Sequence, residues 1–214
     1  SSVPGVATVT SGGTVTVVGA GTTTITATQD ASGNYTGGSV TASLVVSPIA
    51  PSIGALSVPA KNFGDAAFSL TAPTSDSSGA FTYDSSNTAV ATVTSGGTVT
   101  IVGAGSTTIT ATQDASGNYT GGSSVTASLV VSPIAPSIGA LTAPAKNFGD
   151  AAFDLTAPSS NSGGAFSYTS SVPGVATVTS GGTVTVVGAG TTTITATQDA
   201  SGNYTGGSSV TASL

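Results

Sequence analysis

Side chains that could do chemistry are scarce in this chain of 214 residues. It has two lysines, eight carboxylates, and no histidine, cysteine, methionine or tryptophan. General acid–base catalysis near neutral pH uses histidine, or a carboxylate or lysine with a shifted pKa. Lys61 or Lys146 could activate a serine, and Asp150 could pair with Asp154, but Ser69 stands 85 positions before Asp154. A solvated lysine and a varying loop explain these residues better, so we predict no catalytic residues and no enzyme.

A second candidate site is the segment QDASGNYTGG, which occurs at residues 29–38, 113–122 and 198–207. In the middle copy, Asp114, Ser116 and Asn118 place oxygens at positions i, i+2 and i+4, a spacing reminiscent of calcium loops. Each copy has one carboxylate and no distal glutamate, so calcium, the one cofactor candidate, would bind weakly. The favoured interpretation is an Asx-type turn in which Gly117 takes a positive φ and Tyr119 packs on its own core.

The same segment contains Asn-Tyr-Thr, the acceptor pattern for N-glycosylation, and its use depends on the host. The candidate acceptors are Asn34, Asn118 and Asn203. Two further hypotheses carry less weight. Lys61, Asn62 and Asp65 could form an isopeptide crosslink, although such partners normally lie on different strands. Rows of threonine, as in TTTITATQ, could bind ice, although the twist of a sandwich sheet spoils a flat match.

Composition narrows the class of protein. Only 5% of the residues are charged and 38% are hydrophobic, with abundant valine, threonine and isoleucine, which favours folded β-structure over disorder. The net charge is −6 and there is no arginine, so nucleic acid is excluded as a partner. No run of about 18 apolar residues exists, so no segment is expected to span a membrane. Without cysteine there is no disulfide framework.

The organisation of the chain is a tandem repeat. Val6, Val90 and Val175 are equivalent, and the spacings of 84 and 85 residues differ by one inserted serine. A period near 85 is too long for most solenoid units and fits a small β-sandwich. We therefore predict three parts: residues 1–46 as the C-terminal half of a module, 47–131 as a complete module, and 132–214 as a nearly complete one.

In the complete copy, apolar and polar residues alternate with period 2, which is typical of strands that bury one face. Seven strands are expected, at residues 52–56, 66–71, 80–84, 89–94, 98–102, 106–112 and 124–131. No segment has a convincing helical period. Two sheets with one apolar face each must cover one another, which predicts a sandwich.

The ends of the repeats raise two questions of assembly. A half-sandwich leaves a core open and an edge unpaired. Residues 1–46 therefore indicate a window of a longer tandem array or, as the alternative, a module that another chain completes by β-strand addition. Between copies, VVSPIAPSIG carries Pro48 and Pro51, and a short linker with two prolines is semi-rigid. The predicted arrangement is an elongated rod whose partners are neighbouring modules of the same chain and other copies in a fibre or bundle.

The stretch SSNTAVATVTSGGTVTIVGAGSTTITAT, residues 85–112, resembles the signature half of bacterial immunoglobulin-like domains, group 2 and relatives. KNFGDAAFSLTA before it and GNYTGGSSVTASLVV after it are similar to tandem immunoglobulin-like modules of large bacterial surface proteins. The resemblance covers essentially all of the chain. It implies immunoglobulin-like sandwiches, an extracellular or cell-surface location, and a role as spacers or adhesive modules, with no shared catalytic residues.

The pattern of copying bears on function. Residues 3–39 and 172–208 are identical, whereas the middle copy differs from both, for example at Asn87, Ile101 and Ser106. This indicates duplication of a two-module unit. Each added copy lengthens a chain, but a catalytic site gains nothing from repetition. The leading hypothesis is a structural segment of an extracellular stalk or fibre; the alternatives are an array of carbohydrate- or surface-binding modules and a virion decoration protein.

Overall fold

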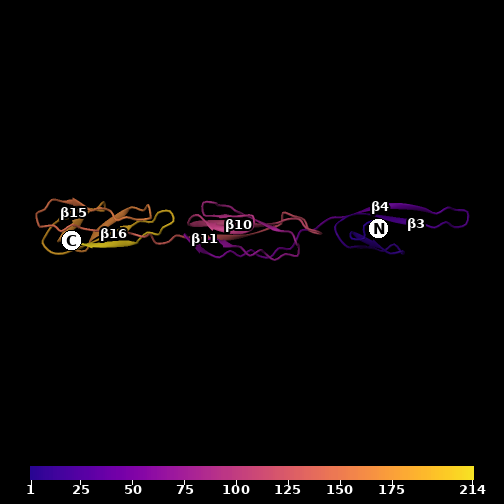
Figure 1. Cartoon of the computed structure of the whole chain (residues 1–214), viewed down its shortest axis with the longest axis horizontal. Helices are drawn as coiled ribbons and strands as arrows, with labels where there is room; N and C mark the ends of the chain where they lie inside the picture. The colour runs from indigo at the N-terminus through magenta and orange to yellow at the C-terminus, as the bar shows by residue number, and fades with distance from the viewer.

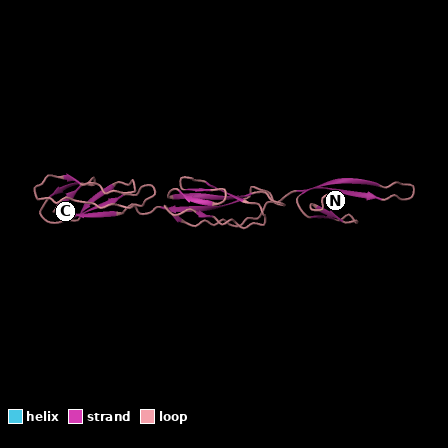
Figure 2. Cartoon of the chain, viewed as in Figure 1, coloured by secondary structure: helices cyan, strands magenta, loops and turns pink.

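The computed structural model describes all 214 residues and contains seventeen strands and no helix, so no helix could cross a membrane (Figure 2). The strands fall into three groups that follow one another along the longest axis of the molecule (Figure 1). We name them the first module (residues 1–46), the middle module (47–131) and the third module (132–214). The all-β fold predicted from the alternating pattern is confirmed.

The middle module is a sandwich of two sheets. One has four strands in the order β5-β11-β10-β7, and the other has three in the order β6-β9-β8. Neighbouring strands are antiparallel except β5 and β11, which are parallel. The strands are β5 (Lys61–Asn62), β6 (Phe68–Ser69), β7 (Phe81–Ser85), β8 (Ala91–Val93), β9 (Thr98–Ile101), β10 (Gly105–Gln113) and β11 (Ser124–Ser132).

The third module repeats this arrangement with six strands. Its sheets have the orders β12-β15-β14 and β13-β16-β17, and all their pairs are antiparallel. Its strands are β12 (Phe153–Asp154), β13 (Phe166–Ser170), β14 (Ala176–Val178), β15 (Thr183–Val186), β16 (Thr193–Gln198) and β17 (Ser209–Ser213).

The first module consists of two antiparallel pairs, β1-β2 and β3-β4. Its strands are β1 (Ala7–Val9), β2 (Val15–Val17), β3 (Gly21–Gln29) and β4 (Gly38–Val46). β3 and β4 pair over nine residues each, from Gly21 opposite Val46 to Gln29 opposite Gly38. These strands correspond to β8–β11 of the middle module.

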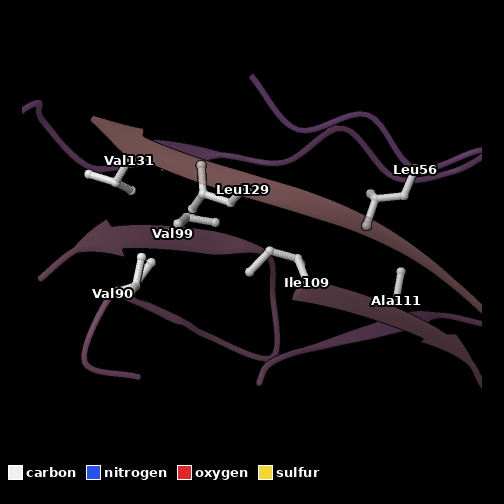
Figure 3. Close-up of a cluster of buried hydrophobic side chains, with 8 residues drawn as sticks. Leu56, Val90, Val99, Ile109, Ala111, Leu129 and Val131 are labelled. Atoms are coloured by element: carbon white, nitrogen blue, oxygen red, sulfur yellow. The ribbon is translucent and has the colours of Figure 1, made fainter. Parts of the chain in front are cut away.

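The core of the middle module lies between its two sheets. Figure 3 shows Leu129 and Val131 close to Val99, with Ile109 and Ala111 on the neighbouring strand. Ile109, Ala111, Leu129 and Val99 have no exposed surface. Valine, leucine and isoleucine on alternate positions can meet in this way because successive side chains of a strand point to opposite faces. The inward alternation predicted for residues 125–131 is therefore confirmed.

The predicted strands of the middle copy agree with the structure except near its beginning. Residues 52–56 were expected to form the first strand, but they make one isolated bridge, between Ile53 and Ser75. The Gly54 amide donates a hydrogen bond to the Thr74 carbonyl at 2.8 Å, and a Cβ at Gly54 would collide with the Thr74 side chain. This close approach replaces a regular ladder. The two-residue parallel strand β5 was not predicted, since two residues carry no periodicity.

A buried glutamine ties a loop of the middle module to the end of β10. Gln113 is 1% exposed, and its Nε2 donates to the carbonyls of Ser77 at 3.1 Å and Gly79 at 2.8 Å. Its Oε1 accepts a hydrogen bond from Ser75 Oγ at 2.7 Å. Gln198 makes the equivalent bonds in the third module. Because buried polar groups are costly unless paired, this amide fixes the loop of residues 75–79 onto β10.

One tyrosine in each of these modules lies against the core. Burial raises the pKa of the phenols of Tyr83 and Tyr168 above the ordinary value of 10.0. Their rings pack on Gly97 and Gly182, where an added Cβ would lie 3.0 and 3.1 Å from a ring carbon. Desolvation disfavours the charged phenolate, so the folded state keeps its proton to higher pH than the unfolded state does.

We expect these two tyrosines to make stability fall at alkaline pH. Their contribution is fully present below pH 10 and is lost as the pH rises through the folded-state pKa, because the unfolded chain releases the proton first. An ultraviolet titration of tyrosinate absorbance should show ionisation above pH 10 that Tyr83→Phe and Tyr168→Phe each reduce. Unchanged curves in both variants would contradict the assignment.

Candidate functional site: the junctions between modules

The residues that were candidates for catalysis do not come together in one site, because each contacts a different partner. Lys61 Nζ lies 4.7 Å from the centroid of the Phe68 ring, and Lys146 Nζ lies 4.8 Å from that of Phe153. These are cation–π contacts, in which the lysine stems cover aromatic surface. Asp154 Oδ1 accepts a hydrogen bond from Thr183 Oγ1 at 2.7 Å, on the sheet β12-β15-β14.

The other carboxylate of that pair makes a local turn. Asp150 Oδ2 accepts a hydrogen bond from the Asn147 amide at 2.9 Å, as Asp65 Oδ2 does from Asn62. Asp150 and Asp154 thus bond to different partners. No group of three or more histidine, cysteine or acidic side chains is placed to hold a metal ion.

The recurring segment QDASGNYTGG forms a tight hairpin turn in each module. In the middle module, Ser116 and Tyr119 exchange two backbone hydrogen bonds, of 3.2 and 3.0 Å, around Gly117 and Asn118. Gly117 has φ 56°, and no residue other than glycine has a positive φ, which is the pattern of a type II′ turn. The predicted positive φ is confirmed. The turn places Asn118 at the tip of the module that faces the preceding one.

The side chain at this tip binds the preceding module. Asn118 Oδ1 accepts a hydrogen bond of 2.7 Å from the amide of Ala20, which lies 98 residues earlier in the turn between β2 and β3. The Asx-type turn predicted here is therefore wrong, because the acceptor oxygen bonds to another module and not to its own loop. In the third module, Asn203 Oδ1 accepts the same bond from Ala104, also at 2.7 Å.

The linker pairs with the same turn. The Ile49 amide donates to the Asn118 carbonyl at 3.0 Å, and the Thr120 amide donates to the Ile49 carbonyl at 2.8 Å, which forms a short parallel bridge. Ile134 makes the equivalent bonds to Asn203 and Thr205, at 3.1 and 2.9 Å. Each junction thus has one hydrogen bond between modules, from an alanine amide to the asparagine, and two that hold the linker isoleucine against the turn of the module that follows. Pro51 is buried, and its fixed φ further restricts the linker.

An aromatic pair adds to the second junction. The rings of Phe63 and Tyr204 lie 5.8 Å apart between centroids and 78° between planes, an edge-to-face contact. Phe63 also packs on the core of the middle module, so it ties that core to the third module. The prediction that this tyrosine anchors its turn on the core was made for Tyr119. In the third module, the equivalent Tyr204 contacts Phe63 of the preceding module. Its counterpart in the first module, Tyr35, is 84% exposed, and Phe148, the counterpart of Phe63, is 72% exposed.

A glycine lets the asparagine approach each junction. A Cβ at Gly103 would lie 2.7 Å from the carbonyl of Ala89 and 3.2 Å from Asn203 Oδ1. Gly19 has the same surroundings at the first junction. A side chain at either position would displace the loop that carries the donating amide. The first glycine of each GAG sequence is therefore required, because the junction leaves no room for a side chain there.

The calcium and glycosylation candidates lie at these same turns. Ser116 Oγ is hydrogen-bonded to Ser78 Oγ at 2.8 Å and Asn118 Oδ1 to Ala20, so two of the three oxygens already have protein partners. Asn34 is exposed and makes no hydrogen bond through its side chain. A glycan on Asn118 or Asn203 would stand between two modules. Calcium binding and glycosylation stay hypotheses.

Sequence reasoning did not find the junction. Its bonds join residues 98 and 99 positions apart, and no local pattern records such a contact. Two signals were present: an asparagine repeated without change at three turn tips, and an unchanged GAG in every copy. Chemically, the asparagine side chain of one module binds a backbone amide of the preceding module, and no charged group takes part. This bond holds the two modules in one relative position.

Comparison with known proteins shows what the repeats are similar to. The family model described as intimin, immunoglobulin-like domain, matches residues 71–118 and 156–201, which lie in the middle and third modules. No curated protein matches the sequence. Among solved structures, mouse cadherin-23 repeats EC22–24 are 14% identical, with 90% of this chain and 72% of that chain covered and a TM-score of 0.35.

Two other solved structures give similar values. The protocadherin GammaB4 extracellular domain is 15% identical over 84% of this chain, with a TM-score of 0.33. Surface-layer protein SbsC, domains 1–6, is 16% identical over 94%, with a TM-score of 0.28. This chain spans 36% of the length of each of these two. The family match, on modules that fold as two-sheet sandwiches, confirms the resemblance seen in the sequence pattern: the middle and third modules are similar to the immunoglobulin-like domain of intimin.

Proposed function

We propose that the chain is a structural segment of an extracellular stalk or fibre, in which the modules act as spacers that hold a distal part of the protein away from the cell surface. The observation that carries the proposal is the repeated junction. The same hydrogen bond, of 2.7 Å, joins the first module to the middle one and the middle one to the third, and in both cases two further bonds hold the linker against the asparagine turn. A spacer needs one fixed geometry at every joint, because random joint angles shorten the reach of a chain.

The chemistry of the junction supports stiffness under varied conditions. Its bonds join amides to carbonyl and carboxamide oxygens, and its aromatic pair is uncharged. Exposed ion pairs weaken as salt rises, but neutral hydrogen bonds and ring contacts do not depend on screening in this way. We therefore expect the angle between modules to stay the same from low to high salt, which suits a protein exposed to an uncontrolled medium.

Pulsed dipolar spectroscopy on the full chain tests this mechanical role. Because the chain has no cysteine, Ser95→Cys and Ser180→Cys introduce spin labels on exposed, equivalent turns of two neighbouring modules. A single narrow distance distribution is expected. Asn203→Ala should broaden it about twofold, because the bond to Ala104 and the position of Tyr204 are lost together.

The chain supplies its own control for this measurement. Asn34 occupies the same place in an identical turn but contacts no other module, so Asn34→Ala should leave the distribution unchanged. A distribution that is already broad in the parent chain would mean freely jointed modules and would contradict the proposed role. Labelling of intact cells of the source organism with antibody to the chain tests the surface location separately.

A further inference from the structure

The edge strands of the middle and third modules are protected to different degrees. A sheet edge carries unpaired N–H and C=O groups that can pair with another chain, and proteins close such edges with short strands, charged side chains, proline or a bulge. The edges that are free in both modules are those of β6, β7 and β8 in the middle module and of β12, β13 and β14 in the third. The opposite edge of the larger sheet is different, because β5 covers β11 there in the middle module.

Five of these six edges are short or charged. β6 and β12 are two residues long, and β8 and β14 are three residues long. β7 is five residues long and has the carboxylate of Asp84 on its exposed face. β13 has the same length, but Thr169 stands at the position of Asp84. It contains no proline and no charged residue, and it pairs with β16 in an unbroken register, so it is the one edge without protection.

The backbone of β13 is open on the side away from β16. In an antiparallel pair, alternate residues bond across to the partner strand. The Ser171 amide donates to the Thr193 carbonyl at 2.9 Å, so Thr169 and Ser167, two and four places earlier, also bond to β16. The N–H and C=O groups of the residues between them therefore point away from the sheet. These residues are Phe166, Tyr168 and Ser170.

The side chains of β13 leave room for a neighbouring strand of the same sequence. Ser167 and Thr169 are exposed on the outer face of the sheet, and both are uncharged. On the inner face, Tyr168 is buried and Phe166 is half-buried. A second β13 would thus place hydroxyl groups beside hydroxyl groups on one face and aromatic rings beside aromatic rings on the other, and such cross-strand pairs stabilise sheets.

We propose that β13 is an interface through which the third modules of two copies of this chain join edge to edge. The two strands pair antiparallel about a twofold axis, with Tyr168 opposite Tyr168 of the second copy and Ser167 opposite Thr169 of the second copy. Two sheets of three strands then become one sheet of six. Because the same edge is used on both sides, the joint closes as a dimer and does not extend into a filament.

Asp84 keeps the middle module out of this association. In the same pairing of two β7 strands, each Asp84 would be the diagonal neighbour of Asp84 of the second copy, about 7–8 Å away on the same face. The two carboxylates would repel each other, and aspartate is also disfavoured in strands. Two chains are therefore joined at one module instead of along their whole length. This property goes beyond the proposed role as a spacer and does not depend on it.

Sedimentation velocity of the full chain over a range of concentrations tests the association. A reversible equilibrium between monomer and dimer is expected. Thr169→Asp should raise the dimer Kd at least tenfold, because each dimer then has two carboxylates at the joint. The fold tolerates aspartate there, since the middle module has Asp84 at this position. Thr211→Asp is the matched control: it adds the same charge to an exposed position of β17, two strands away from β13, and should change the Kd less than twofold.

Two results of that experiment would overturn the proposal. One is a chain that stays monomeric up to millimolar concentration, and the other is an equal Kd for the parent chain and Thr169→Asp. The reverse substitution, Asp84→Thr, gives β7 the uncharged edge of β13, so this variant should form species larger than a dimer. If it formed none, the missing charge would not be what opens β13, and the proposal would fail.

Hydrogen exchange and a crosslink locate the joint. Dimer formation at high concentration should slow exchange of the Tyr168 amide at least tenfold and leave the Tyr83 amide unchanged. Because the chain has no cysteine, Ser167→Cys and Thr169→Cys chains can be mixed under oxidising conditions. Directly opposite residues of a non-bonded antiparallel pair lie about 4.5 Å apart between Cα atoms, within the range of a disulfide. The mixture should therefore crosslink several-fold more than either variant alone. Equal crosslinking in all three samples, or protection of β3 instead of β13, would overturn the proposal.

Discussion

Replacing Gln113 with alanine is expected to lower the free energy of unfolding of the middle module by about 3 kcal/mol. The substitution leaves the carbonyls of Ser77 and Gly79 without their donor, and Ser75 Oγ without its acceptor. A buried polar group that loses its partner costs roughly 1–3 kcal/mol, and the cavity left by the amide adds to this. Hydrogen exchange of the amides of β10 should accelerate by about a hundredfold, since each 1.4 kcal/mol is a factor of ten.

Gln29→Ala is the control for that change. Gln29 lies in the same sequence, TITATQDASGNYTGG, but it is exposed and its side chain makes no hydrogen bond. The amides of β3 should therefore exchange at their original rates in this variant. If Gln113→Ala also left β10 unaffected, water would be satisfying the two carbonyls as well as the amide does, and the loop of residues 75–79 would not depend on Gln113.

The sheets of this protein were predictable because each strand buries one of its two faces, which leaves a pattern in consecutive residues. Thr107, Ile109 and Ala111 face inward and alternate with threonines that face outward. For residues 52–56 the same pattern gave a wrong prediction. Their apolar residues are typical of a strand, but their path is set by the close approach of Gly54 to Thr74, and that contact joins segments twenty residues apart.

The candidate site was predictable in position but not in role. The asparagine-containing turn was singled out by its repetition, and Gly117 was assigned its backbone conformation correctly. The partner of Asn118 was not predictable, because an amide 98 residues away satisfies it and local chemistry offered calcium or an Asx turn instead. Contacts between modules depend on how whole sandwiches stack, which no window of a few residues records.

The second large effect is expected for Leu129→Ala, at roughly 3–4 kcal/mol in the middle module. Leu129 has no exposed surface, and it packs between the two sheets with Val99 and Ile109 (Figure 3). Truncation removes the buried methyl groups and leaves a cavity that strands paired on both sides cannot close. Exchange of the β10 amides should rise by more than a hundredfold, and an increase below tenfold would mean that the sheets collapse into the space.

Leu44→Ala measures how far that cost depends on the opposing sheet. Leu44 is the counterpart of Leu129, pairs with Thr23 in the same register, but stays half-buried because its module presents an open face. With part of the side chain already in water, the loss should be about 1 kcal/mol, and exchange in β3 should rise less than tenfold. Equal effects at the two positions would mean that pairing along one sheet, rather than packing between two, stabilises these modules.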